Sequence, residues 1–212
     1  MPLIPQNPSS YCIHETCQIE NLGWLLEQLP APFGKRTSLS SPGRLVEVGA
    51  FDGVRYSNTW GLIKDKWPAI LIEPMLENVI RCLAEHKNRP WVIVEPVACG
   101  DSEGNLQMFF EREGSRLAGP GEPQISVPMT TLNAILNRHD WQPDFDVLVV
   151  DVEGGEQSVL RGFDLEFYRP KLCIIEAYGW QRDWITNWFD KLYTVFYADG
   201  LNVIFARRDW KT

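Results

Sequence analysis

Short apolar runs alternate with longer amphipathic segments from about residue 44 to the end of the chain. The runs are continuous and rich in branched residues, as in strands buried on both faces of a parallel sheet. The segments between them repeat apolar residues at helical spacing, which is typical of crossover helices. The pattern therefore predicts an α/β fold with a doubly wound, mostly parallel sheet. Its strands are expected at 44–48, 69–72, 91–97, 146–150 and 171–175, and its helices at 58–66, 75–86, 131–137 and 156–160.

Two further patterns depart from this alternation. Residues 106–111 and 124–127, joined by a loop at 114–123, are predicted to form an added strand pair. A helix over 184–192 and strands at 193–197 and 202–206 are expected to close one edge of the sheet with an antiparallel hairpin. No internal repeat is visible.

The first part of the chain has a different character from the rest. Apolar residues at helical spacing predict one helix over 18–28, and the turn-forming stretch 38–43 separates it from the alternating region. We expect an N-terminal helical cap over 1–43 and a main α/β domain over 44–212, folded as one globular unit. Cys12, His14 and Cys17 do not have the spacing of a zinc site.

The charge and composition limit the partners. A net charge of -8 disfavours nucleic acid and anionic membrane surfaces as partners. No window approaches the ~20 apolar residues of a spanning helix, and the N-terminus lacks the pattern of a signal peptide, so we expect a cytoplasmic protein. The five cysteines are odd in number and scattered, which favours reduced thiols.

Acidic residues follow the apolar runs, at the strand ends where open α/β sheets bind their ligands. The first run contains Glu47 and leads into a glycine loop, and Glu73 and Pro74 follow the second run. Asp151 and Glu153 follow the fourth run, and Glu176 follows the fifth. We therefore expect these carboxylates to share one ligand site.

The glycine loop indicates the kind of ligand. Gly49 and Gly53 permit a tight turn, but their spacing is not the G-x-G-x-x-G of a dinucleotide site. Glu47 and Asp52 would repel a diphosphate and attract a ligand with an amino group and a sulfonium, such as S-adenosylmethionine. Glu73 suits the ribose hydroxyls of that cofactor, with Pro74 beside it.

Several of these residues have an alternative structural role. Glu47 and Asp52 can cap the following helix instead of contacting a ligand, and Ser57 can do both. Further along, Ala98 and Cys99 are expected to pack against the adenine ring. Asp101 is expected to accept from the adenine amino group, with a simple turn as the alternative.

Asp151 and Glu153 are the candidate catalytic residues. A carboxylate beside the reactive end of the cofactor can orient an acceptor and remove its proton. Asp151 and Glu176 are also candidate ligands for Mg²⁺, because they end adjacent predicted strands. His14 is a weaker candidate base. Four other residues after or near these strands are expected to have structural roles or to contact the acceptor: His86, His139, Tyr178 and Trp180.

Five separated motifs occur in a fixed order: 47–53 (EVGAFDG), 56–59 (YSNT), 72–74 (IEP), 127–132 (VPMTTL) and 151–156 (DVEGGE). Together they resemble the FkbM-type methyltransferases. The resemblance implies a class I methyltransferase fold, Rossmann-like, that uses S-adenosylmethionine, so 44–212 is the expected methyltransferase domain.

The motifs leave the methyl acceptor open. We expect O-methylation of a small hydroxylated molecule or sugar. The alternatives are N-methylation of a protein or amine, and a non-catalytic binding domain with the same fold.

Overall fold

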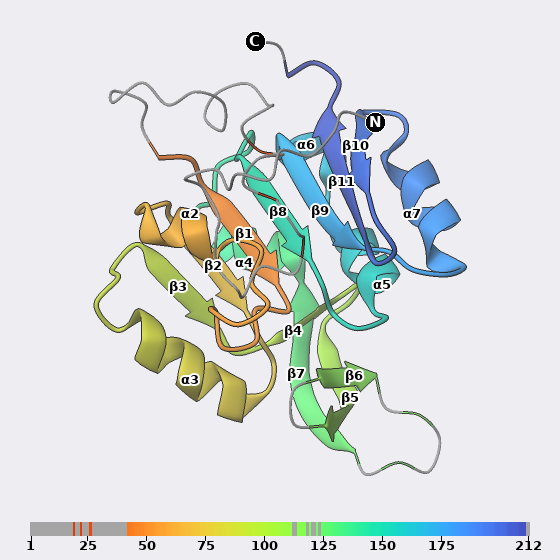
Figure 1. The fold of residues 1–212 in the computed structure, drawn as a ribbon. Helices are drawn as coiled ribbons and strands as arrows, with labels where there is room; N and C mark the ends of the chain where they lie inside the picture. Colours follow the sequence, from red (N-terminus) through yellow and green to blue (C-terminus); the bar gives the residue numbers. More distant parts are fainter. Residues whose placement is uncertain are drawn as a thin grey trace.

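A computed structural model describes residues 19, 22, 26, 42–111, 114–117, 119, 122 and 124–210. Within these residues, seven strands form the main sheet in the order β10-β11-β9-β8-β1-β2-β3 (Figure 1). Strands β3, β2, β1, β8 and β9 are parallel, β11 is antiparallel to β9, and β10 is antiparallel to β11. The strands are β1 Leu45–Val48, β2 Ala69–Ile72, β3 Val92–Glu95, β8 Val147–Val150, β9 Leu172–Glu176, β10 Tyr193–Ala198 and β11 Asn202–Arg207. The expected doubly wound sheet with an antiparallel C-terminal hairpin is confirmed.

Helices cover both faces of the main sheet because its strands are apolar on both sides. The helices are α2 Trp60–Lys64, α3 Leu76–His86, α4 Leu132–Arg138, α5 Glu156–Arg161, α6 Leu165–Tyr168 and α7 Gln181–Phe189. Val46 and Val48 of β1 belong to a core cluster with residues of α4, α5 and α7. Leu45 points to the opposite face and packs in a second cluster with residues of α2. The helix α6 was not predicted.

A second sheet lies beyond the carboxyl ends of the central strands of the first (Figure 1). Within the described residues it has four strands, ordered β4-β7-β5-β6. They are β4 Ala98–Gly100, β5 Gly104–Glu111, β6 Gly114–Leu117 and β7 Ile125–Thr131. The predicted strand pair is confirmed as β5 and β7. The loop predicted over 114–123 is wrong for 114–117, which pair with β5 as a third strand.

The change of sheet occurs at Pro96. The strand expected over 91–97 ends at Glu95, and the Val97 N–H donates to the Glu95 carbonyl over 3.0 Å. This three-residue turn suits proline, which has a fixed φ and no N–H to offer a neighbouring strand. Ala98 then starts β4 in the other sheet.

The predicted cap helix is described at three residues, Ile19, Leu22 and Leu26, which are buried against the α2 face of the sheet. The rest of the proposed cap up to residue 41, with Cys12, His14 and Cys17, lies outside the described residues. Cys82, Cys99 and Cys173 are buried free thiols. Among the described residues, no helix has the length and apolarity needed to cross a membrane.

Candidate functional site

The strand order reverses at β1, which has β2 on one side and β8 on the other. The chain moves outward from β1 to β3 in one direction and then returns to β8 and moves outward in the other. The loops at the carboxyl ends of such neighbouring strands separate and leave a crevice. Here these loops follow Val48 and Val150, and both carry predicted site residues.

Gly49 brings the loops after β1 and β8 into contact. Its φ is +87°, and a Cβ at this position would lie 1.6 Å from the carbonyl oxygen of Asp151. The Asp151 N–H also donates to the Val48 carbonyl over 3.0 Å. Only glycine allows both this dihedral angle and so close an approach of the Asp151 carbonyl. Gly49 therefore lies at the bottom of the crevice, where the two loops meet.

Asp52 and Gly53 shape the loop after β1 from within. Asp52 accepts from the N–H groups of Val54 and Arg55 over 3.1 and 2.8 Å, and its other oxygen pairs with Arg55 Nε at 2.6 Å. Gly53 has a φ of +75° and packs against the His86 ring. Asp52 and Gly53 are outside the linings of both cavities described below. Asp52 therefore stabilises its own loop and does not cap the following helix, which starts at Trp60.

Glu47 lies beneath this loop and is 3% exposed. Its Oε2 accepts from the hydroxyls of Ser57 and Thr59 over 3.0 and 2.5 Å. Ser57 Oγ also accepts from the Trp60 N–H over 3.1 Å, so Ser57 links Glu47 to the start of α2. Burial raises the pKa of Glu47 to about 7, against the lowering effect of these hydrogen bonds.

Glu73 follows β2 and connects the loop after β1 to the start of α3. Its two oxygens accept from the backbone N–H groups of Phe51 and Met75 over 3.0 and 2.9 Å. Asn78 Nδ2 donates to the same carboxylate over 3.3 Å, while Asn78 Oδ1 is buried with no hydrogen-bond partner among the described residues. Burial raises the pKa of Glu73. Glu73 and Asn78 thus present acceptor oxygens side by side.

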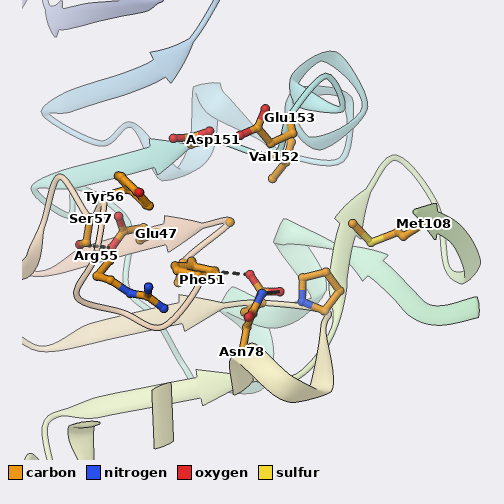
Figure 2. A pocket seen from close by; sticks show the side chains of 14 residues that line it. Glu47, Phe51, Arg55, Tyr56, Ser57, Asn78, Met108, Asp151, Val152 and Glu153 are labelled. Atoms are coloured by element: carbon orange, nitrogen blue, oxygen red, sulfur yellow. Dashed lines mark hydrogen bonds between the residues drawn. The ribbon is translucent and has the colours of Figure 1, made fainter. Parts of the chain in front are cut away.

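These strand ends surround a cavity of about 340 Å³ (Figure 2). The lining brings together seven of the predicted site residues: Glu47, Gly49, Ser57, Glu73, Pro74, Asp151 and Glu153. A second cavity of about 120 Å³ shares Gly49, Pro74, Met108 and Val152 with the first. The two cavities are therefore neighbouring parts of one site.

The second cavity is mainly apolar. Its lining includes the predicted Ala98 and Cys99, together with Val97 and Met129. Asp101 follows these residues but is exposed and lies outside both linings, and its N–H donates to Ser158 Oγ over 3.2 Å. The structure thus brings Ala98 and Cys99 into the site without Asp101.

Carboxylates gather at the ends of β8 and β9. Oxygens of Asp151, Glu153 and Glu176 lie within 4.8 Å of one another. Burial, followed by the charges of Asp151 and Glu153, raises the pKa of Glu176 to about 9. Burial and the charge of Glu156 raise the pKa of Glu153. Glu176 is 5% exposed, and its Oε2 has no hydrogen-bond partner among the described residues.

The other seven lining residues of the larger cavity were not predicted as site residues from the sequence: Ala50, Phe51, Arg55, Tyr56, Asn78, Met108 and Val152. Four of them, Ala50, Phe51, Arg55 and Tyr56, lie in the loop after β1, where proximity to Gly49 was an available signal. Val152 lies between the predicted Asp151 and Glu153. Asn78 follows Pro74 by one helical turn, which was a weaker signal. Met108 comes from the second sheet, and no local pattern marks it.

The other candidates lie away from this lining. His86 contacts the Gly53 carbonyl through Nε2 at 3.2 Å, and His139 pairs with Glu95. Trp180 is exposed and lies outside both cavity linings. Tyr178 is also outside these linings, but burial and the charge of Glu176 raise its pKa. Tyr178 therefore lies near the carboxylates of β8 and β9.

Comparison with known proteins gives a family match for this chain. A family model described as the methyltransferase FkbM domain matches residues 47–200. The matched range contains every predicted cofactor-binding, catalytic and metal-binding residue apart from the weaker candidate base His14. No match was found among proteins of curated function.

Two solved structures share the fold. A methyltransferase FkbM from Methylobacillus flagellatus KT aligns with a TM-score of 0.54 and 16% identity, over 80% of this chain and 46% of that one. The chain therefore spans less than half the length of that relative. A ribosomal protein L11 methylase from Lactobacillus delbrueckii subsp. bulgaricus aligns with a TM-score of 0.50 and 11% identity, over 88% and 77% of the two chains. At these identities the likeness concerns the fold.

Proposed function

Because the chain belongs to the FkbM methyltransferase family, an S-adenosylmethionine-dependent methyltransferase family, we propose that it methylates a hydroxyl oxygen of a small hydroxylated molecule or sugar. The observation that carries the proposal is the convergence of Glu47, Glu73 and Asp151 on one cavity. These acids come from three neighbouring strands and flank a glycine that permits close backbone approach. The carboxylates attract a cationic cofactor and offer acceptors to its hydroxyl groups.

The residues present fit the cofactor. Asn78 Oδ1 is a buried acceptor that lacks a donor, and a ribose hydroxyl would supply one. Glu73, beside it, would accept from the second ribose hydroxyl. The apolar cavity at Ala98 and Cys99 suits the adenine ring, which gains from burial between apolar side chains. Gly49 would let the methionine part pass close to the backbone.

When bound, S-adenosylmethionine supplies a methyl group on a sulfonium sulfur. The protein's part in such an in-line displacement is to align the acceptor oxygen and remove its proton. We assign both tasks to Asp151, which lines the cavity at the end of β8. Glu153 also lines the cavity, two residues later, and would hold a second acceptor hydroxyl.

A divalent cation such as Mg²⁺ is part of this proposal. Asp151, Glu153 and Glu176 offer the carboxylate oxygens that hard cations prefer. The unpartnered, buried Oε2 of Glu176 fits this purpose, because a buried carboxylate oxygen needs a donor or a cation. A cation held there would polarise an acceptor hydroxyl and help orient it.

Two measurements test the proposed function. Isothermal titration calorimetry is expected to detect binding of S-adenosylhomocysteine, and absence of binding with and without Mg²⁺ would overturn the proposal. Transfer of a labelled methyl group to a panel of sugars, small alcohols, amines and proteins then identifies the acceptor. Label found only in amines or proteins would favour N-methylation. Cofactor binding with no transfer to any fraction would favour a binding domain.

A further inference from the structure

The larger cavity contains one cationic side chain among the described residues that line it. Four acids, Glu47, Glu73, Asp151 and Glu153, line the same cavity as Arg55. S-adenosylmethionine, the cofactor of the proposed function on which this inference rests, has a carboxylate as well as two cationic groups. A carboxylate among four acids is repelled unless a cation neutralises it locally. We propose that Arg55 binds the α-carboxylate of the cofactor.

The loop after β1 holds Arg55 in place. Its Nε pairs with Asp52 Oδ2 at 2.6 Å, and its backbone N–H donates to Asp52 Oδ1 over 2.8 Å. The guanidinium also lies over the Phe51 ring, with Cζ 4.9 Å from the ring centroid. These contacts fix the stem and the plane of the side chain, which is 42% exposed. Arg55 is therefore oriented before a ligand binds.

The chemistry of the guanidinium suits a second carboxylate. It carries five N–H donors in a rigid plane, so it can serve Asp52 through Nε and a ligand carboxylate through its end. Lysine would present one flexible charge in place of this fork. The Asp52 pair thus acts as a support for Arg55, which explains why Asp52 is buried in the loop and does not line the cavity.

The position of Arg55 also indicates which end of the cofactor lies in which cavity. The apolar cavity at Cys99 fits the ring of the cofactor, and Gly49 and Pro74 line both cavities. Arg55 lines only the larger cavity, on the loop after β1 (Figure 2). A ligand with its adenine in the apolar part extends its amino acid end into the larger part, where the one cation lies.

The test compares two ligands that differ by the carboxylate alone. The wild-type protein and Arg55→Gln are titrated with S-adenosylmethionine and with decarboxylated S-adenosylmethionine. Arg55→Gln is expected to weaken binding of the intact cofactor about 10- to 100-fold, as for loss of a charge-assisted hydrogen-bond pair. Binding of the decarboxylated ligand should change less than about threefold, because it lacks the group that Arg55 binds. Arg81→Gln, on the exposed face of α3, is the matched control and should change neither affinity.

Each other outcome overturns the inference. Equal loss for both ligands would show that Arg55 only maintains the loop. An unchanged affinity for the intact cofactor, with a raised KM for the acceptor, would assign Arg55 to the acceptor. If the wild-type protein binds neither ligand, the proposed function itself fails, and this result is seen before any variant is measured.

Discussion

The carbonyl oxygen of Asp151 lies where a side chain on Gly49 would begin, 1.6 Å from the ideal Cβ position. The proposed catalytic strand end and the proposed cofactor loop therefore touch through their backbones. Any side chain at residue 49 separates them, so the shape of the crevice depends on the absence of one atom. The geometry of the cofactor loop and the position of Asp151 are consequently coupled.

Gly49→Ala is expected to destabilise the protein and to weaken cofactor binding. Overpacking and a positive φ each cost about 1–3 kcal/mol, so we expect a loss of at least about 2 kcal/mol in unfolding free energy. Urea unfolding and calorimetry with S-adenosylhomocysteine measure the two effects. Gly200→Ala is the control, because a Cβ at Gly200 meets nothing within 4 Å. Equal stability of the two variants would contradict the argument.

The strand-end residues could be predicted because their signal is local. Glu47, Glu73 and Asp151 each lie at the end of a continuous apolar run, and parallel strands bring their carboxyl ends to one edge. The same reasoning located the apolar contacts Ala98 and Cys99. It did not require any knowledge of which strands pair.

Other parts of the site depend on contacts between distant residues. Met108 reaches the cavity only because β5 pairs with β7, which in turn pairs with β4. Asp52 was expected either to contact the ligand or to cap the following helix. In the structure it accepts from the N–H groups of Val54 and Arg55 and so stabilises its own loop. Such choices between a near partner and a ligand depend on the loop conformation, which the residue pattern leaves open.

Stability should depend on pH through Glu47. Its pKa is raised from 4.5 to about 7, so between these pH values the folded protein holds a proton that the unfolded chain has released. The unfolding free energy contributed by this group is therefore greatest below pH 4.5 and falls as pH rises through about 7. The loss is on the order of 3 kcal/mol.

Glu47→Gln removes this titration, since glutamine stays neutral and keeps an acceptor for the hydroxyls of Ser57 and Thr59. Urea unfolding of both proteins from pH 5 to pH 8 gives the difference in stability at each pH. We expect the wild-type protein to lose stability relative to the variant as pH rises. Parallel pH profiles would show that Glu47 titrates normally.

Glu73→Gln is expected to weaken binding of S-adenosylhomocysteine about tenfold or more. Glutamine has one acceptor oxygen, so it cannot serve both the Phe51 and Met75 N–H groups as the carboxylate does. One donor is left unsatisfied, and the ribose loses its charged acceptor. Glu77→Gln, an exposed residue on α3, is the comparison and should leave the affinity unchanged. The prediction fails if calorimetry gives the same affinity for both variants.

Asp151→Asn should separate chemistry from cofactor binding. Asparagine is nearly the same size and leaves the backbone contact with Gly49 in place, but it cannot take a proton from the acceptor. Loss of a general base lowers turnover about 10²- to 10⁴-fold. We therefore expect calorimetry to give an almost unchanged affinity for S-adenosylhomocysteine, while transfer of labelled methyl to the identified acceptor falls by at least about 100-fold. Asp183→Asn, in the first turn of α7 and outside both cavity linings, controls for the loss of one negative charge. Turnover retained in Asp151→Asn would remove Asp151 from the proton transfer, and a parallel loss of cofactor affinity would assign it to binding.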